Sequence, residues 1–145
     1  MADRIPRRIV RDFQGDGIVV HWEPLFCIHS ENCVRQLPRA FNPSERPWIK
    51  AENATAAELA TVIARCPSGA LSFTRTDGGP AEPVSDPATF QPQTDGPIHA
   101  RGNLQVLDSE GNVLRRATRL ALCRCGGSQS KPFCDNSHSV IGFRA

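Results

Sequence analysis

Six cysteines in two separated groups of three constrain this chain of 145 residues more than any other feature. The first group comprises Cys27, Cys33 and Cys66, and the second comprises Cys123, Cys125 and Cys134. In a reducing compartment, thiols serve more often as metal ligands or redox groups than as disulfides. The C-x-C pair in the second group is poorly spaced for bonding to itself but suits a shared metal. We therefore expect two small cores, each stabilised by an inorganic centre.

The N-terminal stretch and the charge balance bear on location. No apolar run reaches the roughly 18 residues that span a bilayer, and the stretch MADRIPRRIVRDF lacks the apolar core of a signal peptide. The formal net charge is only +2, and the clustered arginines at 4–11 and 115–119 are interpreted as solvated surface. We expect a cytoplasmic, bacterial-type protein that binds neither membrane nor nucleic acid.

Residues 1–74 are predicted to form a compact α+β unit. Short strands are expected at IVRDF, GIVVHW and ALSF, and a short helix is expected within NCVRQLPRAF. The clearest helix lies in NATAAELATVIARC, where Thr55 is a plausible N-cap and Glu58 completes a capping box. The apolar residues of that helix fall on one stripe, which predicts that it packs against the strands.

The rest of the chain changes character at about residue 75. Residues 75–97 are rich in proline and glycine without periodicity, and we interpret them as a connector. Residues 98–145 are predicted to form a second, β-rich domain. Its two strands, in IHARGNLQVLD and NVLRRATRLALCRC, are joined by a hairpin turn at SEGN.

The second cysteine group includes a nearby histidine. Cys134 and His138 are four residues apart, so on a helical turn their side chains face the same way. Cys123 and Cys125 would face this turn from the end of a strand, which gives four ligands. Structural zinc accepts this ligand set, although zinc sites usually leave two to four residues between paired cysteines.

The run from Cys123 to His138 has the pattern C-x-C-x2-S-x3-P-x-C-D-x-S-H. It resembles the motif of the CDGSH iron–sulfur domain, the family of mitoNEET. The resemblance implies a [2Fe–2S] cluster, with Cys123 and Cys125 on one iron and Cys134 and His138 on the other. Asn136 stands where the family name has glycine. Asparagine tolerates left-handed backbone angles, so we expect the site to be kept.

The histidine ligand has chemical consequences. Neutral imidazole in place of a thiolate removes negative charge from the cluster and raises its potential. Because a histidine ligand can be protonated, acid is expected to loosen the cluster. Ser128 and Asp135 are expected to form hydrogen bonds around the ligands rather than to bind iron.

The first cysteine group lies in CIHSENC and CPSGAL. In the ferredoxin register C-x2-C-x2-C with a distant C-P, Ser30 takes the place of the second cysteine and Cys66 supplies the distant ligand. Residues 17–73 resemble the divergent mono-cluster ferredoxin family. The resemblance implies a second cluster, [3Fe–4S] or [4Fe–4S], on Cys27, Cys33 and Cys66.

A [4Fe–4S] cluster on three cysteines needs one further ligand. His29 is the first protein candidate, followed by Ser30 or solvent. The alternative for His29 is a hydrogen-bonding or surface histidine, and the alternative for the three cysteines is a buried structural role. The expected fold is therefore α+β, with a ferredoxin-like unit followed by a small CDGSH domain that has a short helical cluster-binding turn.

The sequence lacks several motifs of enzymes, and this narrows the range of functions that we expect. No nucleophile–base pair, phosphate loop or nucleotide fingerprint occurs, so we do not expect an enzyme. Two clusters favour electron transfer with a redox partner protein. The alternative is pH- or redox-gated cluster delivery to an acceptor, or sensing, and a zinc-stapled interaction module is a third option.

The single CDGSH unit bears on assembly. MitoNEET-type members build their fold from two such units, whereas this chain has one. We expect a homodimer through residues 98–145, since the hairpin would otherwise present bare strand edges. The other option is that the ferredoxin-like half takes the place of the second unit.

Overall fold

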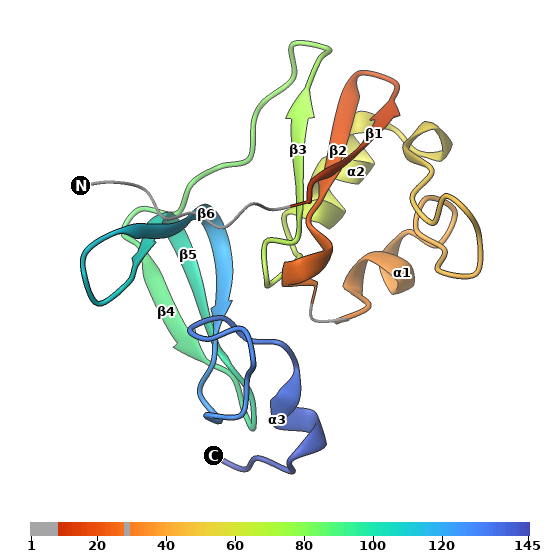
Figure 1. Cartoon of the computed structure of the whole chain (residues 1–145). Helices are drawn as coiled ribbons and strands as arrows, with labels where there is room; N and C mark the ends of the chain where they lie inside the picture. The colour runs from red at the N-terminus through yellow and green to blue at the C-terminus, as the bar shows by residue number, and fades with distance from the viewer. Residues whose placement is uncertain (1–8, 28–29) are drawn as a thin grey trace. The chain divides into compact units, whose positions relative to one another are not determined.

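The computed structural model describes residues 9–27 and 30–145. The chain divides into two compact units, one comprising Val10–Pro83 and one that includes Val84–Ala145, and each is described by itself (Figure 1). Among the described residues, no helix combines the length and the apolar character that a bilayer crossing requires.

The first unit contains a three-stranded antiparallel sheet in the order β1-β2-β3. Its strands are β1 (Arg11–Gly15), β2 (Ile18–Trp22) and β3 (Leu71–Arg75). Gly17 has a φ of 77° in the tight turn between β1 and β2, a conformation that glycine adopts without strain. The strands predicted in this half are confirmed.

Four short helical segments accompany this sheet: η1 (Pro24–Phe26), α1 (Asn32–Gln36), η2 (Ala51–Asn53) and α2 (Ala56–Ile63). The capping box predicted at the start of α2 is present. The Glu58 N–H donates to Thr55 Oγ1 at 3.1 Å, and the Thr55 N–H donates to Glu58 Oε1 at 3.0 Å. Both contacts satisfy amides that the first helical turn leaves without intrahelical partners.

An apolar core lies between α2 and the sheet, and Figure 1 shows α2 beside β2 and β3. Each fully buried Leu, Ile or Val there contributes about 1.5–3 kcal/mol. The helix supplies Leu59, Val62 and Ile63, the sheet supplies Ile18, Val20 and Leu71, and the connecting loops supply Phe41 and Ile49. Because α2 is packed into this core, it fixes the position of the turn that follows it.

A loop between α1 and η2 closes on itself and carries Trp48. Phe41 and Ile49 form an isolated antiparallel bridge, and the Asn42 N–H donates to the Trp48 carbonyl at 2.8 Å. The loop sets Trp48 against Trp22 at the end of β2, with ring centroids 5.0 Å apart and an interplanar angle of 74°. Edge-to-face pairs of this kind contribute roughly 0.5–1.5 kcal/mol beyond their burial.

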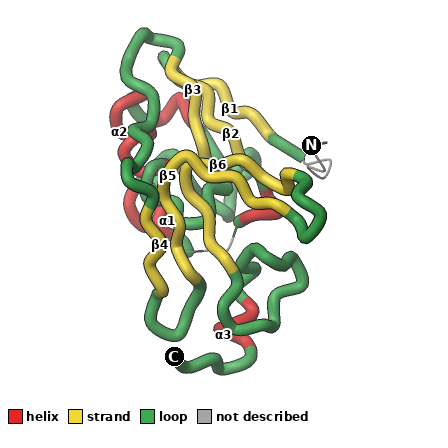
Figure 2. The backbone as a smooth tube through the Cα atoms, turned by 90° about the vertical axis from the view of Figure 1, so that its left-hand side faces the viewer, coloured by secondary structure: helices red, strands yellow, loops and turns green. Residues whose placement is uncertain are grey.

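The second unit is built on another antiparallel sheet, in the order β4-β5-β6. Its elements are β4 (Thr89–Pro92), β5 (Ile98–Leu107), β6 (Val113–Leu122) and the short helix α3 (Ser137–Val140). The long hairpin of β5 and β6 confirms the predicted pair of strands. Figure 2 shows these strands in yellow and the loop that follows β6 in green.

Strand β4 lies inside the stretch that the sequence analysis assigns to a connector. All four of its residues are exposed, so no apolar alternation marks it in the sequence. It forms because it pairs with β5 in register, from Thr89 opposite Arg101 to Pro92 opposite Ile98. Pro92 is tolerated because it stands at the end of the strand. Since β4 covers β5, the bare-edge argument for a homodimer no longer applies to that edge, and the homodimer stays a prediction.

Candidate metal centres

The C-terminal ligand set, by which we mean the predicted ligands Cys123, Cys125, Cys134 and His138, is assembled by pairing at the end of β6. The Cys123 N–H donates to the Pro132 carbonyl at 2.7 Å, and the Cys134 N–H donates to the Ala121 carbonyl at 2.9 Å. These two bonds lay the segment that ends in Cys134 against the segment that leads to Cys123. Residues eleven positions apart in the sequence are thus held side by side.

The turn after Cys134 directs His138 back toward it. Asn136 precedes α3 with a φ of 73°, in the left-handed region, as the substitution of asparagine for glycine predicts. His138 Nδ1 then lies 3.7 Å from Cys134 Sγ. The Sγ atoms of Cys123 and Cys125 are 4.0 Å apart. Both separations are close to the roughly 3.8 Å between two ligands of one tetrahedral metal with bonds of about 2.3 Å.

Main-chain N–H groups point at the sulfur atoms of this set. The Gly127 N–H donates to Cys125 Sγ at 3.3 Å, and the Asn136 N–H donates to Cys134 Sγ at 3.4 Å. Such donors stabilise thiolates, which are the form that binds metal. The loop backbone is therefore arranged for charged sulfur.

The thiol pKa values report the same environment. Burial raises the pKa of Cys123, but hydrogen bonds from the main-chain N–H groups of Ser128 and Gly126, together with Cys125 and Lys131, hold that pKa below its ordinary value. Burial raises the pKa of Cys134, and repulsion from Asp135, Cys123 and Cys125 adds to the rise. Sulfur atoms that would repel one another as thiolates fit a cationic centre, which binds thiolates and removes the repulsion.

Ser128 and Asp135 stabilise the loop instead of contacting sulfur through their side chains. The Ser128 hydroxyl donates to the Phe133 carbonyl at 2.6 Å and is 6% exposed. The Asp135 carboxylate accepts from the Gln129 N–H at 2.9 Å and from the Ser137 N–H at 3.1 Å. Asp135 therefore caps the turn that carries His138 and ties it to the preceding loop.

Arg124, which the sequence analysis did not single out, braces the C-x-C pair from between its cysteines. Its guanidinium donates to the carbonyls of Gly96 at 3.0 Å, Gln93 at 2.9 Å and Ala145 at 3.1 Å, and it lies over the Phe143 ring at 5.3 Å. One side chain thus ties the ligand loop to the β4–β5 turn and to residues 143–145. An arginine inside a C-x-C motif is the only local sequence signal for this role.

The cysteine trio, by which we mean Cys27, Cys33 and Cys66, converges on a cavity of about 230 Å³. Cys27 follows η1, Cys33 lies in the first turn of α1, and Cys66 lies in the turn after α2. All six cysteines lie within the described residues, and none of them forms a disulfide. The three sulfurs of the trio are therefore available to one centre.

The raised pKa of Cys33 indicates that the three thiol groups of the trio lie close together. Burial raises the pKa of Cys33 to about 11, and repulsion from Cys66 and then Cys27 adds to the effect of burial. Three thiolates can share this space only when a cation neutralises them, since a coordinated thiol is deprotonated by the metal.

Two unsatisfied donors in the same cavity wall fit an iron–sulfur cluster. Trp22 and Trp48 both line the cavity, and the Nε1–H group of each is buried without a hydrogen-bond partner among the described residues. A buried donor left without an acceptor costs about 1–3 kcal/mol. The sulfide and thiolate sulfurs of a cluster are acceptors, so the residues present fit such a group.

The structure describes only some of the candidates for the fourth ligand. His29 lies outside the described residues. Ser30 lines the cavity, as does Glu31, a carboxylate that the sequence analysis did not consider. Glu31 immediately precedes α1 with a φ of 63°, which turns the chain from the Cys27 loop into the helix of Cys33.

Ser68 is a further residue that sequence reasoning missed. It is 3% exposed, its Oγ accepts from the Ala70 N–H at 3.2 Å, and it lies 3.7 Å from Cys66 Sγ. When Cys66 is a thiolate it can only accept, so the hydroxyl donates to it. The sequence signal was the short spacing in Cys-Pro-Ser.

Comparison with known proteins gives the family. A family model described as "Divergent 4Fe-4S mono-cluster" matches residues 13–76, and one described as "Iron-binding zinc finger CDGSH type" matches residues 95–139. The chain is 40% identical over 63 residues to "Uncharacterized protein YjdI" of Escherichia coli (strain K12) and equally to that of Escherichia coli O157:H7. The alignment covers 43% of this chain and 83% of the relative. The chain therefore belongs to the divergent 4Fe–4S mono-cluster family, is a relative of YjdI, and carries a CDGSH-type iron-binding domain, which makes it a small iron–sulfur protein.

Proposed function

We propose that this protein is an electron carrier with two different clusters. The C-terminal ligand set holds a [2Fe–2S] cluster, and the cysteine trio holds a [4Fe–4S] cluster with His29 as the candidate fourth ligand. The four-iron form follows the description of the matching family, in preference to [3Fe–4S]. When bound, the clusters supply one-electron chemistry. No residue is assigned a role in converting a substrate.

The pairing of ligands in the C-terminal set carries the proposal. Cys123 with Cys125, and Cys134 with His138, are each spaced for one metal. Within residues 9–27 and 30–145, no group of three or more His, Cys, Asp or Glu side chains is arranged around one ion. All four side chains line one small pocket as two close pairs, and this arrangement supports a centre of two irons over a single zinc.

The ligands and the loop backbone set the electron affinity of this site. His138 contributes a neutral nitrogen where a fourth thiolate would add negative charge. The N–H groups of Gly127 and Asn136 withdraw charge from Cys125 and Cys134. These groups favour the reduced state, so the C-terminal site is proposed as the acceptor of higher potential.

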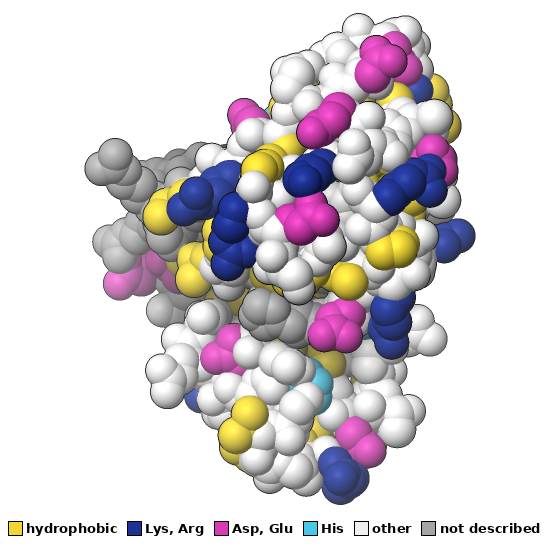
Figure 3. All heavy atoms as spheres, turned by 90° about the vertical axis from the view of Figure 1, so that its right-hand side faces the viewer, with side chains coloured by type: hydrophobic (Ala, Val, Ile, Leu, Met, Phe, Trp, Pro, Cys, Tyr) yellow, Lys and Arg dark blue, Asp and Glu magenta, His cyan; other side chains and the backbone are white. Residues whose placement is uncertain are grey.

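An apolar surface beside the histidine suits a protein partner. Val140 is 87% exposed and Ile141 is 56% exposed, within three residues of His138. Exposed apolar side chains next to a redox centre support transient docking of a redox partner there. On the face shown in Figure 3, basic and acidic side chains are interspersed, which supports a protein partner over a nucleic acid.

Cluster delivery is the second candidate function, because the same exposed surface would also admit an apo-acceptor. The two functions differ in the fate of iron. The purified protein is cycled between reduced and oxidised forms in the presence of an apo-ferredoxin, and both proteins are then assayed for iron. We expect reversible cycling with iron retained by this chain. Rapid transfer of iron to the acceptor from the oxidised form would replace electron transfer by delivery.

A further inference from the structure

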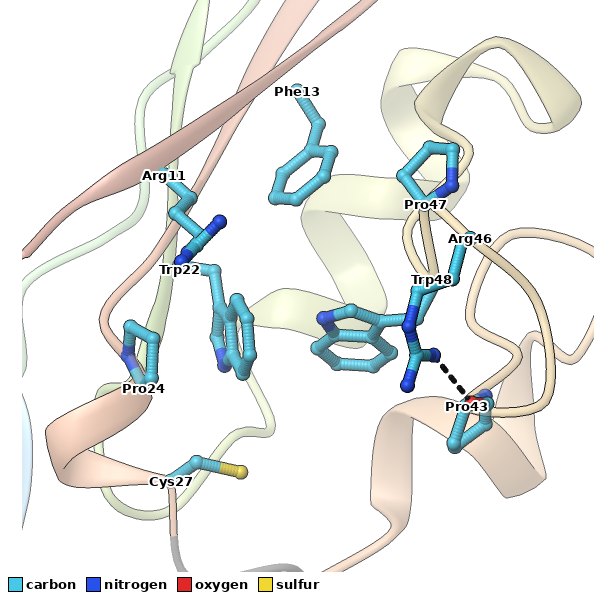
Figure 4. A pocket seen from close by; sticks show the side chains of 9 residues that line it. All are labelled: Arg11, Phe13, Trp22, Pro24, Cys27, Pro43, Arg46, Pro47 and Trp48. Atoms are coloured by element: carbon cyan, nitrogen blue, oxygen red, sulfur yellow. Dashed lines mark hydrogen bonds between the residues drawn. The ribbon is translucent and has the colours of Figure 1, made fainter.

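A pocket of about 570 Å³ opens in the Val10–Pro83 unit beside the cysteine trio, and no assigned function uses it. Figure 4 shows its lining side chains. They are Arg11, Phe13, Trp22, Pro24, Cys27, Pro43, Arg46, Pro47 and Trp48. Its size lies within the range of small-molecule sites, roughly 300–1,000 Å³.

Two structural elements fix the walls of this pocket. Arg11 and Trp22 are direct cross-strand partners on β1 and β2, and Phe13 follows two residues along β1 on the same face. The opposite wall is the loop closed by the bridge between Phe41 and Ile49, which presents Trp48. The aromatic rings therefore stand on hydrogen-bonded backbone, and the pocket is formed before any ligand arrives.

The lining combines aromatic surface with positive charge. Three aromatic rings and three prolines make up most of it, two guanidinium groups are added, and none of the nine residues is acidic. Arg46 is held in place by donating to the carbonyls of Pro43 at 2.9 Å and Glu45 at 2.8 Å. Guanidinium groups pair with phosphate or carboxylate, and aromatic walls stack on flat rings.

We propose that this pocket binds a planar, redox-active ring system that carries a phosphate or carboxylate. The ring lies against Phe13, Trp22 and Trp48, and the anionic group pairs with Arg11 and Arg46. Redox activity is inferred from position, because Cys27, Trp22 and Trp48 line both this pocket and the cavity of the cysteine trio. A ring bound here is in contact with residues that would surround the N-terminal cluster.

Flavin mononucleotide is the probe that tests this site, because it joins a flat redox-active ring to a phosphate. Equilibrium dialysis of the full cluster-loaded protein measures bound flavin without interference from cluster colour. We expect saturable binding of one flavin mononucleotide per chain. Riboflavin, which has the same ring without the phosphate, should bind at least about fivefold more weakly, and inorganic phosphate alone should not compete at equal concentration.

Variants separate the pocket from general charge effects. Arg11→Gln and Arg46→Gln should each weaken flavin mononucleotide binding by about fivefold and leave riboflavin binding unchanged. Phe13→Leu should weaken both flavins alike. Lys50→Gln removes a positive charge from the same unit outside the pocket and should have no effect.

Either of two results would overturn the proposal. One is no saturable binding of flavin mononucleotide by protein whose clusters are intact. The other is loss of affinity in Lys50→Gln equal to that in the pocket variants. Because binding is measured at equilibrium, neither result depends on whether the clusters carry electrons.

Discussion

His138 Nδ1 lies 3.7 Å from Cys134 Sγ, across one short turn that begins at a left-handed Asn136. Under the proposed assignment, this contact places a nitrogen ligand beside the sulfur of Cys134, and the other pair, Cys123 and Cys125, comes from the end of β6. The identity of this ligand should decide the potential of the C-terminal cluster.

Replacement of His138 by cysteine should retain a cluster and lower its midpoint potential by an amount on the order of one to several hundred millivolts, because a fourth thiolate adds negative charge. Redox titration monitored by visible absorbance measures the shift. His138→Ala is the companion variant and should lose the C-terminal cluster while keeping the N-terminal one. An unchanged potential in His138→Cys would remove His138 from the ligand set.

Arg124 should be needed for the rigidity of the ligand loop, since its guanidinium holds three main-chain carbonyls. Arg124→Gln is expected to destabilise the second unit by about 1–3 kcal/mol and to speed loss of the C-terminal cluster to a chelator. Arg144→Gln is the matched control, because Arg144 is 76% exposed and its contact with Asp95 is 3.9 Å long. Equal chelation rates for the two variants would refute this role.

Ser68 should tune the N-terminal cluster through Cys66. Ser68→Ala removes the hydroxyl that lies 3.7 Å from Cys66 Sγ, so the negative charge on that sulfur is less stabilised and the cluster potential should fall. Redox titration gives the shift, and Ser68→Thr, which keeps a hydroxyl, should restore most of it. The assignment would be contradicted if the cluster potential changed with the stability of each variant and not with the presence of a hydroxyl group at position 68.

The capping box of α2 predicts a pH dependence. The Arg39 guanidinium, followed by hydrogen bonds from Thr55, lowers the pKa of Glu58 from 4.5 to about 2. A depressed folded-state pKa stabilises the fold above the unfolded value and loses that contribution as pH falls from about 4.5 toward 2. Glu58→Gln should therefore have a lower melting temperature than the parent protein at neutral pH. The difference between the two melting temperatures should be smaller at pH 3.

Thr55→Ala tests the same box without changing charge. It should cost about 1 kcal/mol, with no comparable convergence toward the parent protein between neutral pH and pH 3. Convergence of Thr55→Ala to the same degree as Glu58→Gln would show that acid acts on the helix by another route.

Local spacing predicted much of this molecule. The turn between Cys134 and His138, the left-handed Asn136 and the Thr55–Glu58 box each depend on residues within four positions of one another. Strand β4 escaped detection because its four residues are exposed and it exists only through pairing with β5.

The aromatic pocket could not be predicted for a related reason. Trp22 and Trp48 are brought together by closure of the loop between Phe41 and Ile49, a contact that no periodicity records. Arg124 is similar, since its partners lie 21–31 positions away. Long-range side-chain contacts are set by the assembled fold and not by the local pattern.

Electron paramagnetic resonance of the purified protein before and after reduction tests the central claim most directly. The account predicts little signal from the oxidised protein and two distinct signals after reduction, one from each cluster, with only the N-terminal signal remaining in His138→Ala. A colourless protein that contains zinc in place of iron, and that stays silent after reduction, would contradict it.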